Sequence, residues 1–257
     1  MLELQHIEMV YNPGAVTEAR LFSDFDLSVA TGEFVSIVGS NGSGKTSLLN
    51  ILCGSVMPTG GDVRIDGESI LRQREHQRYR RIGRVYQDTS MGTCPNLTVL
   101  ENMALADQKG RRFGLNRAVS RQRVEDYRAQ LAGLGLGLEE KLQTRMGSLS
   151  GGQRQAVALL MATMTPLDFL ILDEHTAALD PKTADVIMEL TDRIVREKKL
   201  TALMVTHNLR YAVEYGSRLL MLDRGQIVFD RAGAEKAALT VDDVLGLFTS
   251  ISIECGN

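Results

Sequence analysis

The sequence has 257 residues, of which 44% are hydrophobic and 24% charged, and its formal net charge is −3. The hydrophobic content excludes a disordered chain, and the longest apolar run, residues 156–164, is too short for the ~20 residues of a membrane-spanning helix. The slightly negative charge gives no basic field for binding nucleic acid, and we expect no such partner. The first residues predict no signal peptide. The widely spaced Cys53, Cys94 and Cys255 predict neither a disulfide framework nor a metal knuckle, as is typical of a reducing cytosol.

Short apolar segments and helix signals alternate along the chain. We expect strands at residues 2–10, 25–29, 34–38, 63–65, 82–86, 169–172, 201–205, 219–222 and 227–229. We expect helices at residues 46–53, 98–106, 119–134, 153–164, 181–198, 209–215 and 241–248. This order predicts an α/β fold with a buried, mostly parallel sheet, interrupted by an all-helical insert at roughly residues 88–160.

Two helix starts have specific signals. Thr98 and Glu101 form the sequence pattern of a capping box, in which each side chain bonds the other residue's backbone. Asp180 precedes Pro181, which places a capping side chain before a proline at the first helical position. Both signals predict where the following helix begins.

A glycine-rich loop after the third expected strand matches the pattern G-x-x-x-x-G-K-[ST]. Its members are Gly39, Ser40, Asn41, Gly42, Ser43, Gly44, Lys45 and Thr46, with Ser47 next in the following helix. Glycines let several backbone N–H groups point at one phosphate, and the helix start adds positive charge. Lys45 can reach the β- and γ-phosphates of a nucleotide, and the Thr46 hydroxyl can bind Mg²⁺. The alternative is a turn with a chance lysine, but the strand before the loop and the helix after it favour a phosphate loop.

A second pair of chemical groups follows the strand expected at residues 169–172. Asp173 at such a strand end can hold Mg²⁺, and the neighbouring Glu174 can polarise a water molecule. Two solvated acids at a strand terminus are the alternative. The phosphate loop favours the functional interpretation, because a magnesium nucleotide requires such an acid.

The segment Ser150-Gly151-Gly152-Gln153 precedes another helix and predicts a second anion nest at its N-terminus. A simple helix cap with a flexible glycine pair is the alternative. One phosphate loop has no use for a second nest in the same site, so the nest would serve a nucleotide held by another copy of the chain. This predicts a head-to-tail pair related by two-fold symmetry.

Together with Gln87, residues 178–180 and His207, these motifs stand in an order that resembles the ATP-binding subunits of ABC transporters. The resemblance implies a P-loop NTPase core with an antiparallel β subdomain and an inserted helical signature subdomain. It also implies a role for each matching residue. Tyr11 would stack on adenine, and His207 would contact the γ-phosphate. Asp173 would bind the metal, Gln87 would lie near Mg²⁺ and the attacking water, and Glu174 would be the general base. Asp180 would cross the dimer contact.

The resemblance further implies a single ABC ATPase domain over residues 1–257. Its core would be residues 1–87 and 161–235, its helical subdomain residues 88–160 and its tail residues 236–257. Implied cofactors are ATP and Mg²⁺. Implied partners are a second copy of the chain, an integral membrane permease and, indirectly, a solute-binding protein. The resemblance also implies that the chain lies at the cytoplasmic face of the inner membrane. The permease would dock near Gln87 and Cys94.

Two strings, residues 173–184 and 84–102, are similar to importers labelled as tryptophan/tyrosine uptake systems. We therefore expect an importer of a small solute, with an exporter subunit or a non-transport ABC ATPase as alternatives. His175 departs from the family, which usually has proline there; it either tolerates the same turn or adds a titrating group beside Glu174. Two arginine-rich stretches, residues 72–84 and 109–123, are interpreted as solvated helical faces, or as contacts to a permease or anionic headgroups.

Overall fold

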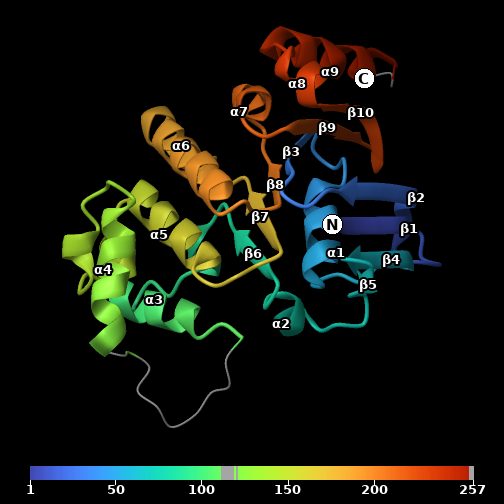
Figure 1. Ribbon diagram of the computed structural model, residues 1–257. Coiled ribbons are helices and arrows are strands. Elements are labelled where there is room, and N and C mark those ends of the chain that lie inside the picture. The colour runs from blue at the N-terminus through green and yellow to red at the C-terminus, as the bar shows by residue number, and fades with distance from the viewer. Residues whose placement is uncertain (111–118, 120, 255–257) are drawn as a thin grey trace. The chain divides into compact units, whose positions relative to one another are not determined.

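The structure is a computed structural model that describes residues 1–110, 119 and 121–254 (Figure 1). The chain forms two compact units, one made of Met1–Tyr79 and Lys199–Asn257 and the other of Arg80–Lys198. Among the described residues, no helix combines the length and the apolar character needed to cross a membrane. The two units are described in turn.

The first unit contains an antiparallel sheet of four strands in the order β2-β1-β4-β5. Its members are β1 (Leu2–Tyr11), β2 (Ala19–Val29), β4 (Gly60–Ile65) and β5 (Glu68–Ser69). Buried residues alternate with more exposed ones along β1, as expected for a sheet with one face on a core. The expected antiparallel β subdomain is thereby confirmed.

A second group of strands in the same unit has the order β10-β9-β3-β8. Its members are β3 (Phe34–Gly39), β8 (Ala202–Val205), β9 (Arg218–Asp223) and β10 (Gln226–Ala232). Strand β3 runs parallel to both β8 and β9, and β10 is antiparallel to β9. Every residue of β3 is buried, because a parallel strand between two neighbours is covered on both faces.

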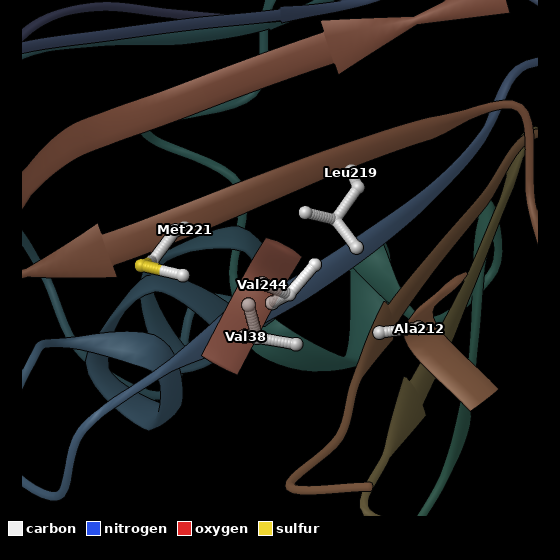
Figure 2. Packing of buried hydrophobic residues seen from close by; sticks show 5 residues of the cluster. All are labelled: Val38, Ala212, Leu219, Met221 and Val244. Atoms are coloured by element: carbon white, nitrogen blue, oxygen red, sulfur yellow. The ribbon is translucent and has the colours of Figure 1, made fainter. Parts of the chain in front are cut away.

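The helices of the first unit are α1 (Lys45–Cys53), α2 (Glu75–Arg78), α7 (Leu209–Glu214), α8 (Gly233–Ala237) and α9 (Val241–Glu254). The short helices α2 and α8 have no counterpart among the expected elements, and α9 extends beyond the expected residue 248. Val244 of α9 packs in a buried cluster with Val38, Ala212, Leu219 and Met221 (Figure 2). Val38 is the residue before Gly39, so the C-terminal helix supports the strand that ends at the phosphate loop.

Among its described residues, the second unit has two parallel strands, β6 (Ile82–Val85) and β7 (Phe169–Asp173). Its α-helices are α3 (Val99–Asp107), α4 (Val124–Ala132), α5 (Gly151–Thr163) and α6 (Pro181–Glu197). Single 3₁₀ turns occupy Thr89–Met91, Arg121–Arg123, Glu139–Lys141 and Met146–Ser148. The α/β architecture expected from the sequence is confirmed, while the division at residues 88 and 160 stays a prediction.

Both specific helix-start predictions are confirmed. Thr98 caps α3 by accepting the backbone N–H of Glu101, whose carboxylate in turn accepts the N–H of Thr98. Asp180 caps α6 by accepting the N–H of Thr183, and Pro181 opens the helix. Local side-chain chemistry therefore sets both boundaries.

The helix expected at residues 119–134 is shorter than predicted, since α4 begins only at Val124. Asp107, at the end of α3, accepts two bonds from the guanidinium of Arg123, at 2.8 and 3.1 Å, and one from the Tyr127 hydroxyl at 3.0 Å. These three hydrogen bonds join the end of α3 to the start of α4. Three arginines of the second basic stretch, Arg111, Arg112 and Arg117, lie outside the described residues.

The interpretation of residues 72–84 as a solvated face is wrong for two of its arginines. Arg84 is largely buried, and Arg78 has 1% of its surface exposed. The Arg78 guanidinium donates to the carbonyls of Ile51 and Leu52 at 2.6 and 3.2 Å, and to that of Leu71 at 2.9 Å. Ile51 and Leu52 are in the last turn of α1, whose carbonyls have no partner within the helix. Arg78 is thus a buried cation that caps the helix beginning at the phosphate loop.

We expect Arg78→Met to lower the free energy of unfolding by about 3 kcal/mol, because buried carbonyls lose a charged donor. Urea unfolding followed by circular dichroism measures this change. The control is Arg74→Met, which removes an exposed arginine next to the same short helix. Equal stabilities for the two variants would contradict the capping role.

Candidate functional site

The phosphate loop follows β3 and packs closely on the first unit. A Cβ atom on Gly39 would lie 2.2 Å from the carbonyl oxygen of Leu222, so only glycine fits there. Gly44 has φ = 107°, and a Cβ there would lie 2.9 Å from the Phe22 ring. Gly44 is the residue before α1, which begins at Lys45 as a phosphate-binding helix requires. Close packing at Gly39 and Gly44 therefore explains why the expected loop has glycine at these two positions.

Lys45 is the central cation of this loop. Its Nζ donates to the carbonyls of Gly39 and Ser40, each at 2.8 Å, and lies 3.5 Å from the Ser43 hydroxyl. These bonds curl the loop around the ammonium group, which is buried. The arrangement holds a positive charge at the start of α1, where the helix end already favours anions. Thr46, the next residue, is exposed.

The turn after β9 holds the phosphate loop from the other side, which the sequence does not indicate. Asp223 accepts a hydrogen bond from the Ser40 hydroxyl at 3.1 Å. The N–H of Gly225 donates to the carbonyl of Ser43 at 3.0 Å. Asp223 and Gly225 lie about 180 residues along the chain from the loop, so no local motif could reveal them.

Tyr11 and His207 both lie close to the loop within the first unit. The Tyr11 hydroxyl is 2.9 Å from that of Ser47, in the first turn of α1. His207 is exposed and follows β8, which pairs in parallel with β3; the N–H of Thr206 donates to the carbonyl of Ile37. The carboxyl ends of parallel neighbours meet at one edge of a sheet. The first unit thus places the loop, Tyr11 and His207 in one region, while their contacts to a nucleotide stay predictions.

In the second unit, β7 ends at the expected acids. Asp173 accepts a hydrogen bond from Nη2 of Arg84 on the neighbouring strand, at 2.6 Å. Glu174 has φ = 47°, a left-handed conformation that is uncommon for residues other than glycine. Such backbone strain concentrates at functional sites. The turn at Glu174 sends the chain away from the strand, and the N–H of Ala177 closes it on the Glu174 carbonyl.

His175 is buried, with 2% of its surface exposed, and its Nε2 lies 3.0 Å from the Thr191 hydroxyl. That hydroxyl donates its proton to the carbonyl of Ile187 at 2.7 Å, so Nε2 must carry the proton of a neutral imidazole. Burial lowers the pKa of His175 to about 4. His175 is therefore a neutral core residue at pH 7, not a titrating group beside Glu174.

Gln87 lies two residues beyond β6 and is exposed. The carbonyl of the preceding Tyr86 accepts a hydrogen bond from Nε2 of Gln155 at 3.1 Å. Gln155 is buried on α5, the helix that begins at the Ser150–Gly152 segment. No sequence motif indicates Gln155 as a site residue, yet it links the segment that carries Gln87 to this helix.

The Ser150 segment forms the start of α5. Ser150 caps the helix by accepting the N–H of Gln153 at 3.3 Å, and the Gln153 side chain accepts the N–H of Ser150 and a bond from Lys141. The helix start required for an anion nest is present. The helix cap, which is the alternative interpretation, is also present.

The two glycines of this segment are confined by neighbouring residues. A Cβ on Gly152 would lie 2.2 Å from Cγ2 of Thr183 on α6, and one on Gly151 would lie 3.2 Å from Leu179. Asp180, between these two neighbours, caps α6, and bonds from Thr183 hold the pKa of its carboxyl below the usual range. The glycine pair therefore joins the start of α5 to the segment containing Asp180, and its role at a nucleotide stays a prediction.

A further group of ligating side chains, His6, Asp24 and Asp26, lies on the surface of the first unit. Nδ1 of His6 is 2.7 Å from an Asp24 oxygen, and this bond raises the pKa of the histidine. All three side chains are mainly exposed. We regard the group as a surface ion-pair cluster.

The sequence family described as "ABC transporter" matches residues 22–177. A tyrosine transport ATP-binding protein of Clostridioides difficile is 42% identical over 96% of this chain and 98% of its own. A lipoprotein-releasing system ATP-binding protein of Caulobacter vibrioides is 36% identical over 87% of this chain and 93% of its own. Among solved structures, a dimeric ATP-binding cassette in a post-hydrolysis state bound to ADP and Pi is 31% identical, with a TM-score of 0.75 over 90% of this chain and 98% of its own.

The buried His175 predicts a specific pH dependence of stability. Its pKa is about 4 in the folded chain and 6.5 when exposed, so between these values the unfolded chain binds the additional proton. Stability from this residue is complete above pH 6.5 and falls as the pH drops towards 4. The loss approaches about 3 kcal/mol at pH 4, at 1.36 kcal/mol per pKa unit.

We expect His175→Gln to keep a donor towards Thr191 while losing this pH dependence. The measurement is urea unfolding of both proteins at a series of pH values between 4 and 8. The difference in unfolding free energy between wild type and variant should change steadily below pH 6.5. A constant difference over this range would show that His175 is not held neutral.

Proposed function

The chain belongs to the ABC transporter family and is an ATPase subunit, and we propose that two copies hydrolyse ATP together to drive import of a small solute through a separate permease. One observation carries the proposal. The chain forms a phosphate loop at the start of α1 and a second, unrelated helix start at Ser150–Gly152. Two helix starts that could each bind an anion, with a single phosphate loop, suit a pair of chains in which each completes the other's site.

We assign the binding of nucleotide to the phosphate loop and Tyr11. Lys45 and the backbone of residues 39–46 would hold the β- and γ-phosphates, and Tyr11 would stack on the adenine. Support comes from the curled loop around Lys45 and from the bond between Tyr11 and Ser47 in the first turn of α1. Ser150, Gly151, Gly152 and Gln153 would contact the nucleotide of the second copy, with Asp180 at the contact between copies.

The oxygen donors of the chain fit a magnesium ion. Mg²⁺ prefers carboxylate, hydroxyl and amide oxygens, and Asp173, Thr46 and Gln87 supply these groups. Bound to the nucleotide, it would neutralise charge on the phosphates. Thr46 and Gln87 are exposed, while the Asp173 side chain is largely buried and accepts a hydrogen bond from Arg84.

Glu174 is the proposed general base. A carboxylate within reach of water can accept its proton as the water attacks the γ-phosphate. Support comes from the position of Glu174 directly after the buried strand β7 and next to Asp173. His207 would contact the γ-phosphate and Gln87 would orient the water.

A permease is the partner implied by the transport names of the relatives. We propose that it docks near Gln87 and Cys94. Cys94 is exposed, and Met91 has 68% of its surface exposed. The turn at Cys94 is held by the buried Asn102, whose Oδ1 accepts the N–H of Cys94 at 2.7 Å and whose Nδ2 donates to the Cys94 carbonyl. A rigid turn that carries exposed apolar side chains fits a protein contact.

We base the proposed import of a small solute on the tyrosine transport subunit that is 42% identical to this chain. We further propose a solute-binding protein as an indirect partner. The 36% identity to a lipoprotein-releasing subunit favours a second candidate, which is release or export of a substrate from the membrane. The neighbouring genes distinguish them: a permease with a binding lipoprotein favours import, and a permease alone favours export. For either role we propose that the chain lies at the cytoplasmic face of the inner membrane.

We expect Glu174→Gln to bind ATP while its hydrolysis rate falls at least about 100-fold, because proton acceptance by the base is lost. The ATP-bound pair of chains should become longer-lived, because hydrolysis no longer separates it. Phosphate release and size-exclusion chromatography with ATP and Mg²⁺ measure the two effects.

The control is Glu140→Gln, which removes an exposed carboxylate from a 3₁₀ turn of the same unit. It should hydrolyse ATP at the wild-type rate. Full turnover by Glu174→Gln would disprove the assigned base, and absence of ATP binding by the wild-type chain would disprove the proposed function.

A further inference from the structure

Within the second unit, Arg84 forms an ion pair with Asp173, the expected metal ligand. Its strand β6 pairs in parallel with β7, with Arg84 opposite Ile171, and its side chain reaches forward to Asp173. Nη2 of Arg84 lies 2.6 Å from Oδ2 of Asp173. Only 6% of the Arg84 side chain and 16% of the Asp173 side chain are exposed. The ion pair is therefore largely removed from water, where charge interactions are strong.

The arginine is also fixed from a second direction. Its Cζ lies 4.7 Å from the centroid of the Tyr86 ring, within the range of a cation–π contact. The Tyr86 carbonyl is bound by Gln155 of α5, which holds this residue in place. Arg84 therefore has little freedom to leave the carboxylate without rearrangement of its neighbours.

The position of this pair bears on the metal. Asp173 and Glu174 are adjacent in sequence, so two acidic residues stand at the end of β7. A guanidinium at one of them offsets part of their negative charge. A divalent cation that approaches Asp173 must share the carboxylate with Arg84 and meets its positive charge at close range.

We propose that Arg84 is an internal counter-ion of Asp173, which occupies this carboxylate in the absence of Mg²⁺ and raises the Mg²⁺ concentration that nucleotide binding requires. The inference rests on the proposed function, because it takes Asp173 as the metal-binding acid. Arg84 is a positioning residue in this account, since it acts through Asp173. Arg81 provides a control, because it forms an ion pair with Asp168 at the other end of the same two strands.

The test compares Arg84→Met with wild type, each saturated with a non-hydrolysable ATP analogue. Titration with MgCl₂ in a calorimeter gives the concentration of free Mg²⁺ at half-saturation. We expect this concentration to fall about five-fold or more in Arg84→Met, because the metal no longer competes with a fixed cation. Arg81→Met should stay within about two-fold of wild type, because its ion pair is far from Asp173 along the strands.

An unchanged or increased half-saturation concentration in Arg84→Met would overturn the proposal and leave the pair a purely structural contact. Failure of the wild-type chain to bind the analogue would instead refute the proposed function. If Arg84→Met does not fold, Arg84→Gln carries the same expectation, since it keeps a hydrogen-bond donor towards Asp173 but loses the charge. Arg84→Lys, which keeps the charge, should retain the wild-type half-saturation concentration.

Discussion

Parallel pairing of strands is the constraint on which the candidate site depends. In the first unit, β3, β8 and β9 run in one direction, so the phosphate loop, His207 and Asp223 follow strand ends at the same edge. In the second unit, β6 and β7 do the same for the segment that carries Gln87 and for the acids at 173 and 174. Loops at the carboxyl ends of parallel strands are free to carry chemistry while the strands themselves stay buried.

The candidate site also depends on how the ends of two helices are held in place. The start of α1 holds Lys45 within a loop that the turn after β9 braces, and its other end is capped by the buried Arg78. The start of α5 is capped by Ser150 and fixed through Gly152 against α6. Both helices are thus held at the residues that would face phosphate. An ATPase that works by closing two copies on each other needs such preformed ends, because disordered ones would cost conformational entropy on closure.

Local signals explain which parts of this structure could be predicted from the sequence. The strand–glycine loop–helix pattern, the capping box at Thr98 and the proline after Asp180 each act within a few residues. The acids after β7 could be identified for the same reason. Resemblance to the family supplied roles for Tyr11, Gln87 and His207, which no local pattern singles out.

The remaining features depend on contacts between distant segments. Arg78 and Arg84 stand in a run of arginines that looks like a solvated surface, yet each is buried against acceptors that are remote in sequence or on another strand. The environment of His175 depends on Thr191 on α6. The contacts of Asp223 and Gly225 with the phosphate loop join opposite ends of the chain. Charge and periodicity cannot reveal such pairings, because they appear only once the chain has folded.

We propose that one chain is half of a catalytic unit. The most direct measurement is the ATPase rate per chain over a roughly thousand-fold dilution, with the assembly state followed by sedimentation at the same concentrations. We expect the rate per chain to fall as the pair of chains dissociates. A constant rate per chain under conditions where the protein sediments as a monomer would contradict it, since a single copy would then hold a complete site.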